Sequence, residues 1–192
     1  MGVNPRSPFV IDTRDLGRRP GSMLELECTA PAPSGWGLDL VRVPPSAPVR
    51  LRLRLEAVVD GVLVTASVHA PLEGECGRCL EAFATDLDLD TAELYLYDPD
   101  SDDDEDVCAL DGDLIDLEPM LRDAVVLALP LNPVCDEECA GLCTGCGARL
   151  ATLPPGHTHE ATDPRWVALR AWSEHSGDSS ATMDDKSDLR EN

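Results

Sequence analysis

The stretch from Val49 to Ala70, VRLRLRLEAVVDGVLVTASVHA, carries the strongest structural signal, because apolar and polar residues alternate along it. Successive side chains of a β-strand point to opposite faces, so residues 49–56 predict a strand with one buried and one wet face. Asp60-Gly61 predicts a two-residue hairpin turn, since both residues tolerate positive φ. A second strand is then expected over residues 62–70, antiparallel to the first.

Two more patterns follow along the chain. Residues 83–90 alternate again and continue toward Tyr97, which predicts a third strand with an acidic outer face formed by Asp86, Asp88 and Asp90. Residues 114–129 repeat apolar side chains at helical spacing, with Asp116 as the N-cap and Pro130 as the stop. We therefore expect an α+β fold: an antiparallel β-meander or small barrel-like sheet with one main helix and a cysteine-rich zinc-knuckle tail.

Composition divides the rest of the chain. Residues 1–22 are rich in Arg, Pro and Gly and predict an N-terminal arm. Residues 23–150 predict one domain that holds the zinc site, and residues 151–172 predict its C-terminal extension. Residues 173–192 predict a disordered acidic tail, and the like-charged run at 98–106 predicts a solvated loop.

The charge balance restricts the partners. A net charge of −22 repels phosphate backbones at long range and favours basic partners. The sequence shows no signal peptide and no apolar run long enough to span a bilayer, so we expect a cytoplasmic monomer without membrane contact. Arg50, Arg52 and Arg54 share one strand face and are possible contacts for a partner or RNA. The alternative is that they neutralise the acidic outer face of the same sheet.

Eight cysteines in a chain expected to be cytoplasmic indicate metal ligands rather than disulfides. Cys76 and Cys79 form one C-x2-C knuckle, and Cys143 and Cys146 form a second. Two such knuckles complete a closed, tetrahedral zinc site. The sequence therefore predicts one structural zinc per chain, held by Cys76, Cys79, Cys143 and Cys146.

Cys135 and Cys139 leave other ligand sets open. They could join the second knuckle in a site local to the tail, or join Cys76 and Cys79 as the alternative second pair. Further ligands are available in the HTHE segment, 157–160, but its Pro/Gly/Thr-rich surroundings favour solvated side chains. The remaining cysteines, Cys28 and Cys108, stand alone and are expected to be ordinary small hydrophobes.

Catalysis has little support in this sequence. Cys139, Cys143 and Cys146 have the spacing of a radical-type iron–sulfur loop. The chain, however, is too short for the barrel that usually carries such a cluster. Neither knuckle lies in the βαβ context of a redox pair. A catalytic zinc keeps an open position and a nearby base, whereas this chain has more than enough thiols to close the site.

The knuckle at 76–81, CGRCLE, resembles the C-x-R-C-L signature of the YceD family, also known as domain of unknown function 177. The order of other features agrees over about residues 10 to 170. These features are Ile115-Asp116-Leu117 at the helix start, Leu129-Pro130-Leu131 at its end, Cys135, Cys139, the Gly141-Leu142-Cys143 knuckle that continues to Cys146-Gly147, and Asp163-Pro164-Arg165-Trp166.

The resemblance implies a role in accumulation of large-subunit ribosomal RNA and hence in ribosome biogenesis. It supplies no catalytic residues. We therefore expect a non-catalytic factor. The net charge of −22 adds the expectation that it acts through a basic ribosomal protein or the pre-ribosomal large subunit. The alternatives are a zinc module that binds RNA directly and, less favoured, a zinc-dependent hydrolase.

Overall fold

The computed structural model describes residues 3–99, 107–159 and 165. Most of the acidic run at 98–106 and the whole predicted tail at 173–192 lie outside these residues, as does most of the predicted C-terminal extension after residue 159. The chain divides into two compact units, Met1–Gly141 and Leu142–Asn192.

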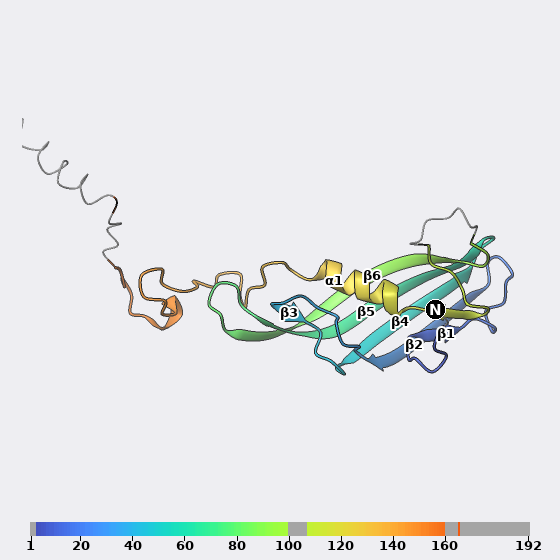
Figure 1. Ribbon diagram of the computed structural model, residues 1–192, viewed down its shortest axis with the longest axis horizontal. Coiled ribbons are helices and arrows are strands. Elements are labelled where there is room, and N and C mark those ends of the chain that lie inside the picture. The colour runs from blue at the N-terminus through green and yellow to red at the C-terminus, as the bar shows by residue number, and fades with distance from the viewer. Residues whose placement is uncertain (1–2, 100–106, 160–164, 166–192) are drawn as a thin grey trace, which may run out of the picture. The chain divides into compact units, whose positions relative to one another are not determined.

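The first unit is built on an antiparallel sheet (Figure 1). Its strands are β2 (Met23–Pro31), β3 (Val41–Arg42), β4 (Pro48–Ala57), β5 (Gly61–Glu75) and β6 (Ala82–Leu96). β6 pairs with β5 along its whole length, and β4 pairs with both β5 and β2. The short β3 pairs with the far end of β5. The expected antiparallel sheet is confirmed; β2, which the sequence analysis did not identify, extends it.

The hairpin between β4 and β5 forms where it was expected, but its geometry differs from the prediction. The Val58 N–H donates to the Gly61 carbonyl at 2.9 Å, so Val59 and Asp60 are the two loop residues. Gly61 belongs to β5, where an added Cβ would collide with the Tyr95 carbonyl of β6. Glycine is needed here for close strand approach rather than for positive φ.

The helix begins one turn later than the sequence predicts. Residues Leu114–Asp116 form β7, which pairs with β1 (Val10–Asp12) in a two-stranded sheet. Helix α1 spans Glu118–Ala128 and has its proline in the first turn. Asp116 Oδ1 accepts the Glu118 N–H at 3.0 Å, so its side chain still caps the helix start although Leu117 is the N-cap residue. Pro130 follows the helix end as expected.

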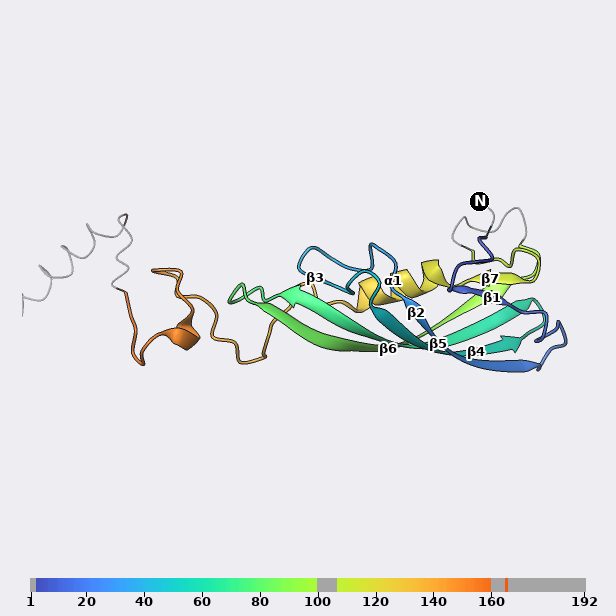
Figure 2. The same ribbon diagram turned by 90° about the horizontal axis from the view of Figure 1, so that it is seen from below.

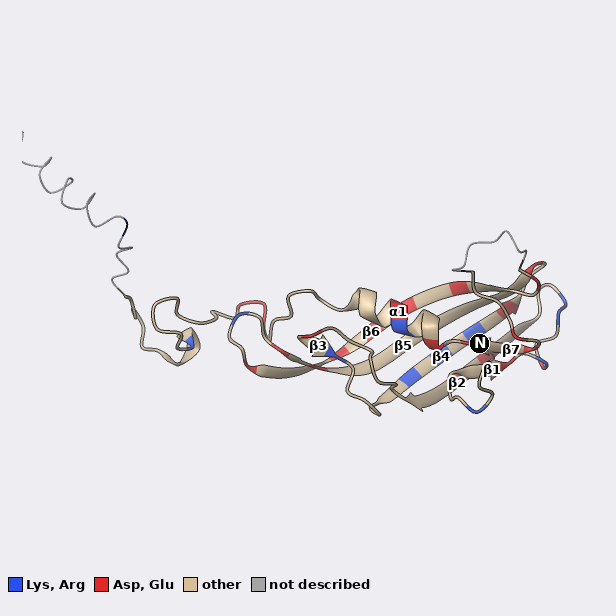
Figure 3. Ribbon diagram, in the orientation of Figure 1, with Lys and Arg blue, Asp and Glu red and all other residues tan. Residues whose placement is uncertain are grey.

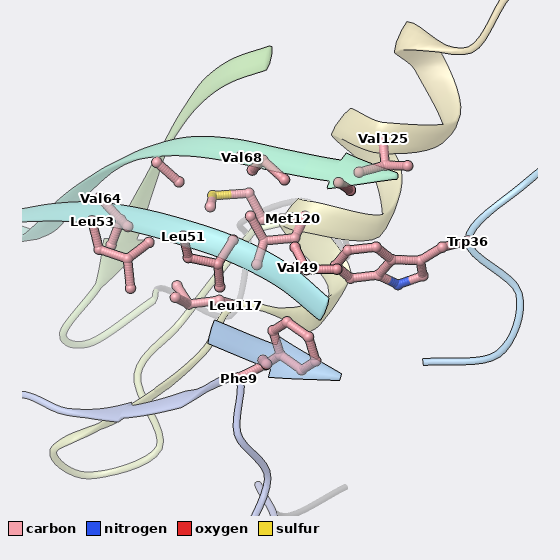
Figure 4. Packing of buried hydrophobic residues seen from close by; sticks show 14 of the residues in the cluster. Phe9, Trp36, Val49, Leu51, Leu53, Val64, Val68, Leu117, Met120 and Val125 are labelled. Atoms are coloured by element: carbon pink, nitrogen blue, oxygen red, sulfur yellow. The ribbon is translucent and has the colours of Figure 1, made fainter. Parts of the chain in front are cut away.

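The core lies between α1 and one face of the sheet (Figure 2). The apolar faces of β4 and β5 are buried, as their alternation predicted, and Leu121 and Val125 of α1 are fully buried against them. Phe9, from the segment predicted to be an arm, is buried and packs on Trp36 with ring centroids 5.4 Å apart (Figure 4). Residues before 23 thus contribute to the core.

The second unit has little regular structure in its described part. Its elements are a 3-10 turn, η1 (Leu150–Thr152), and an isolated bridge between Leu142 and Arg149. None of its described residues, 142–159 and 165, is buried. Across both units, the described helices are too short and too polar to cross a membrane.

Candidate metal centre

The first C-x2-C knuckle is the connection between β5 and β6. The Cys76 N–H donates to the Glu81 carbonyl and the Leu80 N–H donates to the Cys76 carbonyl, each at 2.8 Å, which closes a tight loop at the end of the hairpin. Leu80 adopts a left-handed conformation with φ of 60°. Both sulfurs of a C-x2-C sequence are brought to one side by such a turn.

A second loop, after α1, is fastened to this knuckle by hydrogen bonds. The Gly77 N–H donates to the Pro133 carbonyl at 2.8 Å. The Arg78 guanidinium donates to the Glu137 carbonyl at 2.9 Å and to the Cys139 carbonyl at 3.2 Å. Arg78, which sequence reasoning used only as part of a motif, therefore positions the second pair of cysteines against the first.

The sulfur atoms of the two loops are spaced as zinc ligands. Cys76 Sγ lies 3.8 Å from Cys139 Sγ, and Cys79 Sγ lies 3.7 Å from Cys135 Sγ. Zn–S bonds of about 2.3 Å in a tetrahedron place two sulfurs about 3.8 Å apart, far beyond a disulfide bond of about 2.05 Å. All four sulfurs lie within 4.8 Å of one another, so this group could hold a metal ion.

Backbone dipoles favour a thiolate at the buried end of the group. The N–H groups of Cys135, Cys79 and Arg78 point at Cys76 Sγ, and they lower the pKa of that thiol to about 6. Hydrogen bonds with the neighbouring sulfurs of Cys139 and Cys79 raise the pKa of Cys135 to about 12. One thiolate is therefore preformed at neutral pH, and a bound cation would compensate the charge of the others.

A second group forms within the other unit. Cys143, Cys146, His157 and His159 have ligand atoms that all lie within 4.8 Å of one another. The N–H groups of Gly145 and Cys146 point at Cys143 Sγ and lower the pKa of that thiol. The sequence analysis favoured solvated histidines in this loop, whereas the structure brings both to the knuckle; Glu160 lies outside the described residues. The sequence signal for these two ligands was the H-x-H pair, which begins eleven residues after Cys146.

The structure thus gathers Cys135 and Cys139 with Cys76 and Cys79, which was the third ligand set considered from the sequence. It gathers Cys143 and Cys146 with two histidines. The single zinc site predicted from the two C-x2-C knuckles stays a prediction, because those knuckles belong to different units. Cys28 and Cys108 are half-buried and belong to neither group, in agreement with their expected role as small hydrophobes.

Arg50, Arg52 and Arg54 are exposed and alternate with buried residues along β4, where Figure 3 marks basic positions of the ribbon in blue. β5 separates β4 from β6, so the arginines do not face the acidic residues of β6 directly. Arg52 instead pairs with Glu27 of β2 at 2.8 Å, and Arg54 pairs with Glu56 at 3.0 Å. Arg52 and Arg54 are thus paired, but not with the acidic outer face of β6 that the sequence analysis named. Among the described residues, no ion pair is recorded for Arg50.

This outer face is also slightly hollowed. A concavity of about 780 Å³ is lined by side chains and backbone of the four long strands, including Arg50, Arg52, His69 and Asp88. His69 Nδ1 lies 2.8 Å from a carboxylate oxygen of Asp88. The face therefore presents cations on β4 beside carboxylates on β6, with histidine between them.

Comparison with known proteins gives several matches. The model of the family described as large ribosomal RNA subunit accumulation protein YceD matches residues 64–171, which include both candidate metal groups. An uncharacterized protein of Mycobacterium tuberculosis is 46% identical over 167 residues, covering 85% of this chain and 80% of the relative. One from Mycobacterium leprae is 40% identical, covering 85% and 76%.

A more distant relative has a descriptive name. The maize protein named large ribosomal RNA subunit accumulation protein YCED homolog 1, chloroplastic, is 28% identical over 159 residues. The match covers 62% of this chain and 51% of the maize protein. No solved structure matches the chain.

Proposed function

This chain belongs to the YceD family of large ribosomal RNA subunit accumulation proteins, and we propose that it supports large ribosomal RNA accumulation as a non-catalytic factor in ribosome biogenesis. The observation that carries this proposal is the family match over residues 64–171. That region contains β6, α1, most of β5 and the four-cysteine group, so it covers the sheet edge and the candidate metal centre together.

The four-cysteine group is proposed to be a structural zinc centre. Thiolate ligands in tetrahedral arrangement are typical of structural zinc, whereas a catalytic zinc has three protein ligands and an open position. The bound ion would link the β5–β6 connection to the loop after α1, two segments separated by more than fifty residues. Its role would be to hold the surface on which the factor binds its partner.

The proposed partner is a basic ribosomal protein, met free or on a nascent large subunit. Support comes from the net charge of −22 and from the acidic stripe on β6. The side chains of Asp86 and Asp88 are 65% and 78% exposed. β6 is an edge strand: in the described residues its other side carries only an isolated bridge, from Leu96 at its end to Ala109. Opposite charge steers such a partner toward this edge. We propose that the protein acts as a monomer in the cytoplasm.

Direct RNA binding is the second candidate, and Arg50 favours it. This guanidinium faces the outer concavity without a recorded ion-pair partner in the described part of the chain. Arg52 and Arg54 are exposed beside it, but each already pairs with a glutamate. To contact phosphate, Arg52 and Arg54 would have to leave these glutamates, and the negative charge of the protein would oppose the approach of RNA.

Depletion in cells, followed by binding assays, tests the proposal. Cells without the protein should show a lower ratio of large-subunit to small-subunit ribosomal RNA than undepleted cells, and an unchanged ratio would remove the function. Purified protein should co-isolate with a basic large-subunit protein and bind bare ribosomal RNA only weakly. Tight RNA binding that weakens steeply with salt, and is lost in Arg50→Glu, would keep the function and replace the proposed partner with RNA.

A further inference from the structure

We propose that the second unit binds its own zinc ion through Cys143, Cys146, His157 and His159, so that the chain carries two zinc ions. Two thiolates and two imidazoles form a closed tetrahedral site of the kind that holds structural zinc. This group is separate from the four-cysteine centre, and no residue is shared between them. The inference goes beyond the proposed function; its total of two ions, though not the mixed site itself, rests on the zinc centre proposed above.

The knuckle that contributes the thiolates is already folded for metal. The Gly147 N–H donates to the Cys143 carbonyl at 2.7 Å, and Gly147 has φ of +71°, a conformation that favours glycine. The Cys143 N–H donates to the Ala148 carbonyl, also at 2.7 Å, and closes the loop from the other side. This turn places both sulfurs on the side from which the histidines approach.

The histidines complete the site with distances suited to zinc. His157 Nε2 lies 3.6 Å from Cys146 Sγ. A tetrahedral zinc with Zn–S of about 2.3 Å and Zn–N of about 2.0–2.1 Å separates these atoms by about 3.5–3.6 Å. The rings of His157 and His159 are edge-to-face, with centroids 4.6 Å apart and planes at 82°, so both reach the same point from one short segment.

Gly145 provides a second, independent indication. A Cβ on this residue would lie 2.6 Å from His159 Cγ and Cδ2, which is closer than carbon atoms pack. The imidazole therefore rests directly on the knuckle backbone. Gly145 does not have positive φ, so a glycine here serves the approach of the ring rather than the turn.

The absence of buried side chains among residues 142–159 also indicates a metal. Residues 142–159 include no buried side chain, yet they hold a defined loop, a bridge and a 3-10 turn. A segment this small cannot bury enough apolar surface to offset the entropy of ordering, and such segments need a metal or disulfides. Its two cysteines are free thiols grouped with imidazoles, so a metal rather than a disulfide is the stabilising element here.

The test is the zinc content of the full-length, reduced protein, measured by elemental analysis per chain. Wild type should hold two ions. The double variant H157A/H159A should hold one, as should C143S/C146S and C135S/C139S. The matched control C28S/C108S should keep two. A metal content that H157A/H159A leaves unchanged would overturn the proposal. If wild type holds one ion and both H157A/H159A and C143S/C146S lose it, the mixed site stands and the four-cysteine centre holds no zinc. Loss of every ion in C143S/C146S with none lost in H157A/H159A would support the single site of joined knuckles.

A zinc X-ray absorption spectrum separates the two centres by ligand type. C135S/C139S should leave an ion with sulfur and nitrogen in equal number, whereas H157A/H159A should leave one with sulfur only. An all-sulfur spectrum in C135S/C139S would refute the mixed site. Gly145→Ala should also lose one ion, because its new Cβ would lie 2.6 Å from the His159 ring. None of these readouts depends on ribosomal RNA.

Discussion

Removing zinc from the four-cysteine centre should lower thermal stability without unfolding the sheet. The perturbation is the double variant C135S/C139S, which deletes the two ligands of the loop after α1 and leaves the β5–β6 hairpin intact. The hydrophobic core consists of strand residues, loop residues and α1, and it contains none of the four cysteines. We therefore expect the sheet to remain folded while the two cysteine loops come apart.

The size of the effect follows from linkage between binding and folding. An ion present at about 1,000 times its dissociation constant adds about 4.1 kcal/mol to the free energy of unfolding. For a domain of about 150–250 residues, each kcal/mol shifts Tm by about 2–4 °C. Wild type in excess zinc should therefore melt about 8–16 °C above the variant, and removing zinc with a chelator should bring wild type close to the variant.

Two assays check this expectation. Thermal melting followed by circular dichroism measures the difference in Tm, with C28S/C108S as the control for cysteine replacement away from the centre. Hydrogen exchange should show lost protection at 76–81 and 133–141 and retained protection in β4 and in the middle of β5. Equal Tm for variant and control in excess zinc would refute the structural metal. Loss of protection throughout β4 and β5 at 25 °C would refute the independence of the core.

Three further outcomes are expected. Arg78→Ala should lower the free energy of unfolding, measured in urea, by about 1.5–3 kcal/mol, because a charged donor to two carbonyls is lost. An equal loss in the surface variant Arg122→Ala would contradict the positioning role of Arg78. Zinc affinity of the four-cysteine centre should fall as pH decreases, because Cys135, with its pKa near 12, must release a proton on binding; calorimetry in buffers of different ionisation enthalpy should detect that proton, and no release would contradict the ligand assignment. Leu121→Ala should lower the free energy of unfolding by about 2–5 kcal/mol, since Leu121 is fully buried. Leu127→Ala, on the exposed side of α1, should lower it by less than about 0.5 kcal/mol. Similar losses in the two variants would show that α1 does not pack as described.

Local patterns were sufficient for the elements that repeat within a few residues. Alternation in 49–70 predicted β4 and β5 and their buried faces, because a strand turns successive side chains to opposite sides whatever its neighbour is. Pro130 predicted the helix end because proline restricts the residue before it. The C-x2-C spacing indicated metal ligands for the same local reason, since two thiols so spaced meet across one turn.

Pairing between distant segments could not be read in the same way. Residues 114–116 have helical periodicity, but they form β7 because β1, about a hundred residues earlier, offers its backbone hydrogen bonds. Arg52 finds Glu27 rather than the acids of β6, because β2 takes the place beside β4 and β5 stands between β4 and β6. Phe9 enters the core since Trp36 and the sheet leave room for it.

The grouping of the cysteines shows this division most clearly. Six thiols of two knuckles and one loop admit several tetrahedral sets with equal local chemistry, so spacing alone left the choice open. The hairpin of β5 and β6 and the path of the chain after α1 bring Cys135 and Cys139 to the first knuckle. The loop beyond η1 brings two histidines to the second. The local spacing of cysteines indicates which residues can bind a metal. Which of them share one ion depends on the tertiary structure, because it brings distant segments of the chain together.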